Sequence, residues 1–451
     1  MLALTNATVI TGDGRTLLAR ATVLAADGRI TELRAGSGVP AGARVLDLEG
    51  DYLLPGFINS HVHGVTFGPL FASGAPPLAE EAIRRNLVRH LLAGTTTVLS
   101  VDGFALPEEV AEAQHLSPLT IKTSAGLTPA ALTAAQAVDG AGLTERHLAA
   151  SLKEQVEAGA VAIGEAGSGH TLGGGGSEYM YIPRRIKEET GVEISPAQAR
   201  ALKEAALGKE LDPAARDEAA LQAALAGAGL AGRLTPARAQ ALIAACVLPG
   251  LKPARRSIAE AAATARHFGL PLIAHTAPPS LAAVLAAARA GTRTIAAHTN
   301  HDSFTAGAML AAVRALKRAG ALLDGATFDS FGARRTTESP ANLVTLLKAG
   351  LVDLITTDYG GGFFDPLPLA LKAIVGAGIL PLPAAVRLLT AAPATALPGL
   401  APERGRIAPG YIADLTVLAR ADLARVRYVF ISGRQVFSSE VTSGITSSSD
   451  V

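Results

Sequence analysis

The sequence contains a single cysteine, Cys246, and so cannot form a disulfide within the chain. This excludes a small disulfide-stabilised fold and is compatible with a reducing compartment. An excess of charge of one sign is also missing, because 40 Lys and Arg residues balance 39 Asp and Glu residues. The resulting net charge of +1 creates no strong field that would attract nucleic acid or an anionic membrane. We therefore expect a small-molecule partner and no nucleic-acid partner.

We also expect neither a secretory signal nor a transmembrane segment. The first residues, MLALTNATVITGDG, lack the basic stretch and the apolar run of about 7 to 15 residues that form a secretory signal. Residues 271–288 contain no Asp, Glu, Lys or Arg, but Pro278 and Pro279 interrupt this run and His275 lies within it. This favours a buried strand and a helix over a membrane span. We expect a cytoplasmic protein with no membrane partner.

The two ends of the chain share a β-rich pattern. Short β-rich runs alternate with glycine-containing turns near the N-terminus, which is typical of hairpins, and the same pattern returns near the C-terminus. We predict that residues 1–55 and 386–437 form one small β-sandwich domain. Residues 438–451 are rich in serine and have no periodic apolar face, which predicts a disordered tail.

Between these ends, apolar runs that end in polar residues alternate with segments of helical period. This alternation predicts βα units and a parallel sheet, and eight such units close into a barrel. We therefore predict an α/β fold in which residues 56–385 form a (β/α)8 barrel of the TIM type. Active sites of such barrels lie at the carboxyl ends of the strands. The predicted strands span residues 56–61, 95–101, 119–125, 160–165, 270–275, 293–298, 321–328 and 351–358.

Residues 171–256 are too many for one connection between barrel strands. Within this segment, Ser195-Pro196 and Thr235-Pro236 start two similar stretches, each with a hydroxyl N-cap and proline at the first helical position. We predict a helical insertion near the mouth of the barrel. The glycines at 173–176 are not a phosphate loop, because no Lys-Ser/Thr pair follows them, and we expect a flexible hinge there.

His61 and His63 are two residues apart at the end of the first predicted strand. On a strand, this spacing directs both side chains to the same face, here toward the barrel axis. Imidazole nitrogen is a good ligand for zinc and other first-row divalent ions. The pair therefore predicts half of a metal site.

The stretch LLPGFINSHVH at residues 53–63 resembles the first-strand motif of the amidohydrolase superfamily, and PGYIADL at 409–415 resembles its return into the small β-domain. The resemblance spans nearly the whole chain. It implies that the fifth and sixth strands each end in a histidine ligand and that the eighth ends in a catalytic aspartate. In this sequence those residues are His275, His298 and Asp358.

The fourth strand of this superfamily usually supplies a carboxylated lysine that bridges two metals, whereas here the strand ends in Glu165. This resembles an enamidase-like branch in which glutamate is the bridge. The resemblance implies two divalent ions held by His61, His63, Glu165, His275, His298 and Asp358. We expect zinc, with iron, manganese, cobalt and nickel as alternatives.

The implied reaction is hydrolysis of a C–N bond by metal-activated hydroxide, with Asp358 as general base and then general acid. A cyclic amide such as a lactam, imide, hydantoin or enamide is the expected substrate. The alternatives are deamination of a heterocycle with one metal and hydrolysis of an isoaspartyl-type dipeptide. Deaminases typically place a glutamate three residues after the fifth-strand histidine, where this sequence has Pro278. A non-enzymatic barrel is a further alternative, because fold does not fix function.

The substrate-binding residues are less well defined by the sequence. His170 and His301 lie close to predicted ligand strands, and Tyr359 follows Asp358. Arg334 and Arg335 follow the seventh strand and are candidates for a bidentate contact with a substrate carboxylate, with exposed surface arginines as the alternative. We also expect a homo-oligomer.

Overall fold

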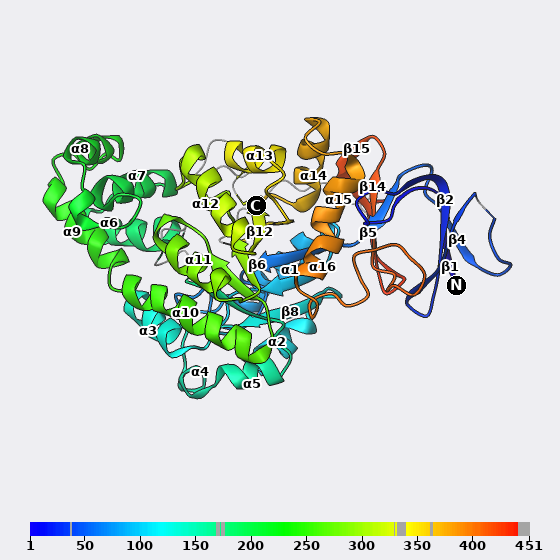
Figure 1. Cartoon of the computed structure of the whole chain (residues 1–451), viewed down its shortest axis with the longest axis horizontal. Helices are drawn as coiled ribbons and strands as arrows, with labels where there is room; N and C mark the ends of the chain where they lie inside the picture. Colours follow the sequence, from blue (N-terminus) through cyan, green and yellow to red (C-terminus); the bar gives the residue numbers. More distant parts are fainter. Residues whose placement is uncertain are drawn as a thin grey trace.

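The structure is a computed structural model that describes residues 1–36, 38–167, 172, 176–328, 330–331, 340–360 and 364–440. It contains two eight-stranded sheets, one in the barrel and one in a smaller β-domain. Figure 1 shows the small β-domain on one side of the barrel and a group of helices at the far end of the molecule. No helix in these residues is long and apolar enough to cross a membrane.

The barrel sheet has the order β13-β12-β11-β10-β9-β8-β7-β6, and the neighbouring strands in it run parallel. A parallel bridge between Val62 and Tyr359 joins its two outer strands and closes the barrel. Each strand overlaps one of the eight predicted ranges, so the (β/α)8 barrel is confirmed. The strands are β6 (Phe57–Val62), β7 (Thr95–Ser100), β8 (Thr120–Ala125), β9 (Ala162–Ala166), β10 (Leu272–His275), β11 (Thr294–Ala297), β12 (Leu322–Ala326) and β13 (Leu354–Thr356).

Alanine-rich helices cover the outside of the barrel. Ala261 and Ala265 of α10 are buried in the same core cluster as Ile163 of β9 and Leu272 of β10. Small side chains let a helix approach the sheet closely, while the branched strand residues fill the space between the layers. The barrel helices are α1 (Glu80–Leu92), α2 (Pro107–Gln114), α3 (Pro129–Val138), α4 (Glu145–Ala149), α5 (Leu152–Glu157), α10 (Leu251–Phe268), α11 (Leu281–Arg289), α12 (Ala306–Arg318), α13 (Ala341–Lys348), α14 (Leu367–Gly376), α15 (Leu382–Leu389) and α16 (Ala391–Ala396).

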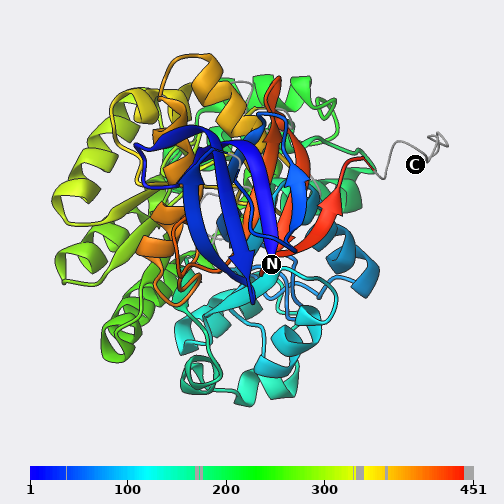
Figure 2. The same cartoon turned by 90° about the vertical axis from the view of Figure 1, so that its right-hand side faces the viewer.

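Strands from both ends of the chain build the small β-domain, as Figure 2 shows. The sheet order is β16-β15-β14-β5-β1-β2-β3, and β4 pairs with β1. The antiparallel pairing of β14 with β5 joins the C-terminal strands to the N-terminal ones, and the expected β-domain from the two chain ends is confirmed. Its strands are β1 (Leu2–Ile10), β2 (Leu17–Ala26), β3 (Arg29–Ala35), β4 (Arg44–Asp47), β5 (Tyr52–Pro55), β14 (Leu415–Ala419), β15 (Asp422–Ile431) and β16 (Arg434–Ser438). Ser438, the first residue of the predicted tail, thus belongs to a strand, and residues 441–451 lie outside the described part.

The segment between β9 and α10 forms a group of helices with its own hydrophobic core, which includes Leu202, Leu221 and Leu242. Both expected N-caps are present, because the Ser195 hydroxyl accepts a hydrogen bond from Gln198 N and the Thr235 hydroxyl accepts one from Arg238 N. Of the predicted glycine hinge at 173–176, residues 173–175 lie outside the described part of the chain. The elements are η1 (Ser177–Tyr181), α6 (Ile182–Thr190), α7 (Pro196–Leu207), η2 (Pro213–Ala215), α8 (Glu218–Gly227) and α9 (Pro236–Val247).

Candidate metal centre

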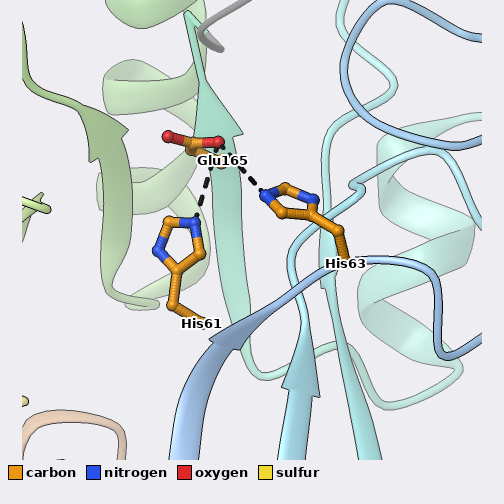
Figure 3. Close-up of side chains that lie close together, drawn as sticks. All are labelled: His61, His63 and Glu165. Carbon is orange, nitrogen blue, oxygen red and sulfur yellow. Dashed lines mark ion pairs between the residues drawn. The ribbon is translucent and has the colours of Figure 1, made fainter. Parts of the chain in front are cut away.

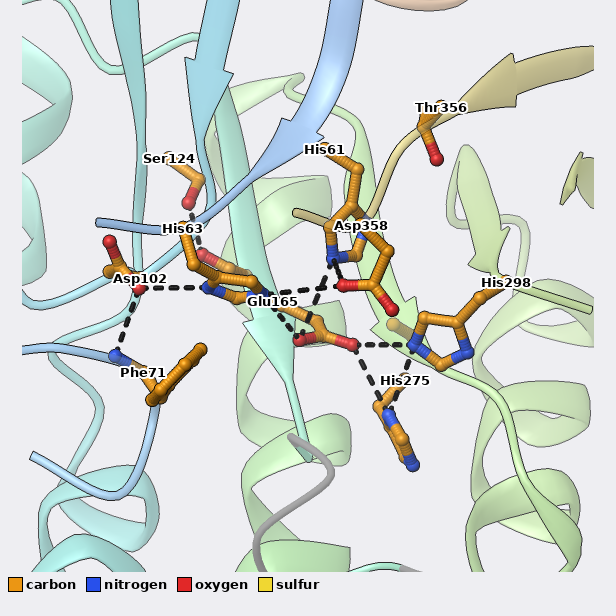
Figure 4. A network of polar contacts seen from close by, with 12 residues as sticks. His61, His63, Phe71, Asp102, Ser124, Glu165, His275, His298, Thr356 and Asp358 are labelled. Carbon is orange, nitrogen blue, oxygen red and sulfur yellow. Dashed lines mark hydrogen bonds and ion pairs between the residues drawn. The ribbon is translucent and has the colours of Figure 1, made fainter. Parts of the chain in front are cut away.

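Six side chains of metal-ligand type meet at the carboxyl ends of five barrel strands (Figure 4). The structure therefore brings together all six residues that the sequence suggested as ligands, and we call them the candidate metal centre. Five are buried, and the Asp358 side chain is 24% exposed, which leaves the centre open at Asp358. His61 lies in β6 and His63 just beyond it, Glu165 lies in β9, His275 ends β10, His298 follows β11 and Asp358 follows β13.

The carboxylate of Glu165 divides its two oxygens between two pairs of histidines. Oε2 lies 3.8 Å from His61 Nε2 and 3.9 Å from His63 Nε2 (Figure 3). Oε1 lies 3.3 Å from His275 Nδ1 and 3.0 Å from His298 Nε2. Each oxygen thus faces one pair of imidazole nitrogens, which is the arrangement required of a carboxylate that links two ions.

Asp358 closes the centre on the side of β6. Its Oδ1 lies 3.3 Å from His61 Nε2 and 3.6 Å from His63 Nε2. Asp358 and His298 have backbone φ angles of 49° and 36°. Such left-handed conformations are uncommon for residues other than glycine and cluster at functional sites. His298 comes directly after β11, and Asp358 is the second residue after β13.

Asp102, which follows β7, fixes the orientation of His63. Asp102 Oδ1 lies 2.8 Å from His63 Nδ1 and also accepts a hydrogen bond from Phe71 N. Asp102 Oδ2 accepts hydrogen bonds from Gly64 N and the Ser100 hydroxyl. A carboxylate on Nδ1 keeps the proton there and leaves Nε2 free to bind a metal. The sequence reasoning missed Asp102, because a single aspartate beyond a strand carries no motif.

Asp324 of β12 holds the backbone of His298 in place. Its Oδ2 accepts a hydrogen bond from His298 N, and both of its oxygens accept from the Thr356 hydroxyl. Burial is the largest influence on this group and raises the pKa of Asp324 to about 7. Through these hydrogen bonds Asp324 links the end of β11 at His298 to Thr356 of β13.

The charges of the candidate centre are distributed unevenly over its histidines. Burial lowers the pKa of His61 to about 4 despite the nearby carboxylates. Burial also acts on His63 and His298, but the carboxylate of Asp102 next to His63 and that of Glu165 next to His298 outweigh it. The pKa of His63 is raised to about 10 and that of His298 to about 9. Without metal, two imidazolium ions therefore compensate the carboxylates.

Both carboxyl groups of the centre are ionised. Burial opposes the charge of Glu165, but hydrogen bonds from His275 and His298 hold the pKa of Glu165 well below its usual range. Burial likewise opposes the charge of Asp358, and His61 and His63 lower its pKa. Ionised carboxylates are the form that a metal requires.

The donor set fits divalent ions. His61 Nε2, the nitrogen that faces Glu165 and Asp358, is buried and has no hydrogen-bond partner in the described part of the chain. A buried polar atom without a partner is costly unless something binds it. Three groups have donor atoms within 4.8 Å of one another: His61, His63 and Glu165; His61, His298 and Asp358; and Glu165, His275 and His298. Imidazole and carboxylate donors suit zinc and its first-row neighbours.

The suggested substrate-binding residues have different positions. His301 lies beside the centre, with its ring 5.8 Å from the His275 ring and 5.7 Å from the His298 ring. Tyr359 does not face the centre: it is buried, and its hydroxyl donates to Asn86 Oδ1 on α1. His170, Arg334 and Arg335 lie outside the described residues.

Residues 52–436 match the amidohydrolase family. The chain belongs to this family, and it is therefore a hydrolase that acts on carbon–nitrogen bonds.

Solved structures share the fold over nearly the whole chain. A prolidase complexed with N-methylphosphonate-L-proline is 19% identical with a TM-score of 0.58, covering 97% of this chain and 99% of that one. The β-aspartyl dipeptidase of Fervidobacterium islandicum AW-1 in complex with a β-Asp-Leu dipeptide is 14% identical with a TM-score of 0.57, covering 97% and 96%. A D-hydantoinase is 17% identical with a TM-score of 0.53, covering 97% and 95%. No curated protein matches the chain.

Proposed function

We propose that the protein is a hydrolase with two divalent metal ions bridged by Glu165, and that it cleaves a cyclic amide. One observation carries the two-metal proposal: each oxygen of the Glu165 carboxylate faces its own pair of histidines. A glutamate that bound a single ion would leave one of these pairs without a shared ligand. The bridge would be the carboxylate of the chain itself, as in the enamidase-like branch, rather than a carboxylated lysine.

The residues divide into two ligand sets. His61, His63 and Asp358 would hold one ion, His275 and His298 would hold the other, and Glu165 would contact both. Zinc is the ion that we propose first. When bound, the ions would act as Lewis acids and make water a nucleophile at neutral pH.

Asp358 is the proposed proton carrier. Its carboxylate is ionised, it is the most exposed group of the centre, and its Oδ1 faces the two histidines of β6. An ionised carboxylate accepts the proton of the attacking water and then donates it to the departing nitrogen. The leaving amine is thereby neutralised as the C–N bond breaks.

His301 is the proposed contact for the substrate carbonyl. Its Nδ1 accepts a hydrogen bond from Ser303 N at 3.1 Å. This bond requires a lone pair on Nδ1, so that the proton of the neutral ring resides on Nε2. His301 then has one N–H available to stabilise a developing oxyanion.

The D-hydantoinase fold supports a cyclic amide as the substrate, since hydantoins belong to that class. The prolidase and β-aspartyl dipeptidase folds support a dipeptide as the second candidate. Deamination is less well supported, because Pro278 starts the 3-10 helix Pro278–Ser280 where a deaminase would typically have its glutamate.

The metal bridge is tested by counting ions. Chelator-treated protein is reloaded with zinc in CO₂-depleted and in bicarbonate-supplemented buffer, and metal content and activity are measured in both. We expect about two ions per chain in both buffers, because Glu165 needs no CO₂ to carry a carboxylate. Glu165→Gln should retain at most one ion, whereas Glu112→Gln, an exposed residue of α2, should retain both. Two ions in Glu165→Gln, or recovery only with bicarbonate, would contradict the bridge.

The substrate class is tested on the zinc-loaded protein with hydantoins, lactams, imides, β-aspartyl and prolyl dipeptides, and aminoheterocycles. Ring opening without ammonia release is the expected result. Turnover of dipeptides alone would favour the second candidate, and ammonia release from aminoheterocycles together with one bound ion would favour deamination.

A further inference from the structure

A cleft with a volume of about 580 Å³ lies where the small β-domain meets the barrel. Its walls come from the turn between β1 and β2, the segment from Leu347 to Val352, α15 and the loop that contains Arg406. Val352 precedes β13 and Asp358 follows it, so the cleft lies toward the amino end of the strand whose other end reaches the candidate metal centre. Figure 1 shows α15 next to the small β-domain. This cleft is therefore separate from the metal centre.

Among the residues that the structure describes, three arginines and one carboxylate line the cleft. Arg15, Arg387 and Arg406 are exposed, and none of them forms an ion pair with another residue that the structure describes. The accompanying carboxylate, Asp13, is bound within its own turn: Oδ1 accepts hydrogen bonds from Arg15 N and Thr16 N, and Oδ2 accepts one from the Thr16 hydroxyl. The guanidinium groups are always charged at neutral pH. The cleft thus carries a net positive charge.

Close packing holds the turn and α15 together. Gly14 has a φ of 89°, and a Cβ at this position would lie 2.8 Å from Arg387 Cδ. The stem of Arg387 therefore lies against the backbone of the β1–β2 turn. Any larger residue at position 14 would displace it. Arg387 and the turn that carries Arg15 are in this way held next to each other.

The loop of Arg406 is fixed to both neighbouring walls. Ile407 donates a backbone hydrogen bond to Thr11 O at 2.9 Å, and its side chain is buried. A Cβ at Gly405 would lie 2.9 Å from Thr390 O, which shows how closely the loop approaches the end of α15. Three segments that are far apart in the sequence thus present their arginines from a preformed backbone, which lowers the entropic cost of binding.

The base of the cleft is apolar. Leu347 and Leu388 are buried, and Val352 and Leu380 are half-buried beside them. Ligand pockets typically measure about 300 to 1,000 Å³ and combine an apolar lining with a few polar groups. We propose that this cleft binds an organic anion whose phosphate or carboxylate group contacts the arginines and whose apolar body lies on the leucines.

Calorimetric titration of the metal-loaded, full-length protein tests this assignment with three probes of similar shape. Phenyl phosphate and 3-phenylpropionate carry the two possible anionic groups, and benzyl alcohol is the neutral control. Both anions should bind, and the anion whose charged group matches that of the natural ligand, phosphate or carboxylate, should bind more tightly. Benzyl alcohol should bind at least about tenfold more weakly because it forms no charge-assisted hydrogen bond.

Arg387→Ala and Arg406→Ala should each weaken anion binding about tenfold or more. Arg314→Ala is the matched control, since Arg314 is an exposed arginine of α12 that lies away from the cleft lining. Anion affinity that is equal in wild type and both cleft variants would overturn the proposal, because it would place the anion elsewhere, for instance at the metals. Equal affinity for benzyl alcohol and the anions would overturn it as well. Neither result depends on the number of metals that Glu165 bridges.

Discussion

Replacing Asp102 by asparagine tests whether the Asp102 carboxylate orients His63 for metal binding. The carboxylate accepts hydrogen bonds from His63 Nδ1 at 2.8 Å, Phe71 N at 2.9 Å, Gly64 N at 3.0 Å and the Ser100 hydroxyl at 3.2 Å. An amide keeps one oxygen and places an NH₂ group where the other oxygen stood. If the NH₂ group replaces Oδ1, the N–H groups of His63 and Phe71 lose this acceptor. If it replaces Oδ2, the N–H group of Gly64 loses this acceptor. Each loss costs about 1 to 3 kcal/mol.

Two measurements separate the effects of Asp102→Asn. Removing the acceptor that orients a histidine ligand typically weakens metal affinity about 10 to 100-fold, and chelator competition at pH 7 measures this change. Thermal unfolding of the metal-free protein measures the loss of stability. Asp27→Asn is the control, because Asp27 is exposed in a turn with a φ of 51° that asparagine tolerates.

A lower unfolding temperature combined with unchanged metal affinity would refute the reasoning. It would mean that Asp102 only stabilises the loop after β6 and that His63 needs no carboxylate to present Nε2. Asp102→Ala extends the test, since it removes all four acceptor contacts and should weaken metal binding more than the asparagine variant does.

Three further predictions concern protons. Asp358→Asn should lower kcat about 10² to 10⁴-fold while retaining at least the ion held by His275 and His298, and near-normal turnover by metal-loaded variant protein would rule out Asp358 as the base. The pKa values of His63 and His298 are raised to about 10 and 9, so loading the metal-free protein at pH 7 should release at least about two protons per chain, measured with an indicator dye in weak buffer. The share that comes from these two imidazoles should fall as the pH rises through 9 and 10. His90 is buried, neither of its ring nitrogens has a hydrogen-bond partner among the described residues, and its pKa is lowered to about 3. Since its unfolded pKa is near 6.5, stability is lost as pH falls below 6.5, by about 2 kcal/mol at pH 5, and His90→Phe should remove this loss in urea titrations.

The barrel could be predicted from the sequence because short β-rich runs that end in polar residues alternate with segments of helical period. All eight predicted ranges overlap a strand, since strands covered on both faces leave a signal that does not depend on their partners. The observed strands are mostly shorter: β13 covers only Leu354–Thr356 of the predicted residues 351–358. Residues 351–353 and 357–358 lie outside the strand, and sequence pattern does not show where pairing stops.

The positions of the six ligand-type residues were also predictable, because a strand end fixes where a side chain lies in a barrel. The sequence could not show which side chains beyond the strand ends face the metal centre. Tyr359 follows Asp358 directly, yet its hydroxyl reaches Asn86 on α1 rather than the centre. Asp102, the second residue after β7, lies against the His63 ring. Beyond a strand the alternation of side chains no longer holds, and only the packed barrel determines which residue faces the centre.

The strand β5 has a consequence for how the protein is made. It pairs with β1 on one side and with β14 on the other, and residues 56–414 separate β5 from β14. During synthesis, one edge of β5 therefore stays open until the ribosome has released almost the entire barrel. An open edge with Leu53 and Leu54 invites pairing with other chains. Nascent chains that stop before residue 415 should therefore aggregate more readily than full-length chains, even where their barrel helices are complete.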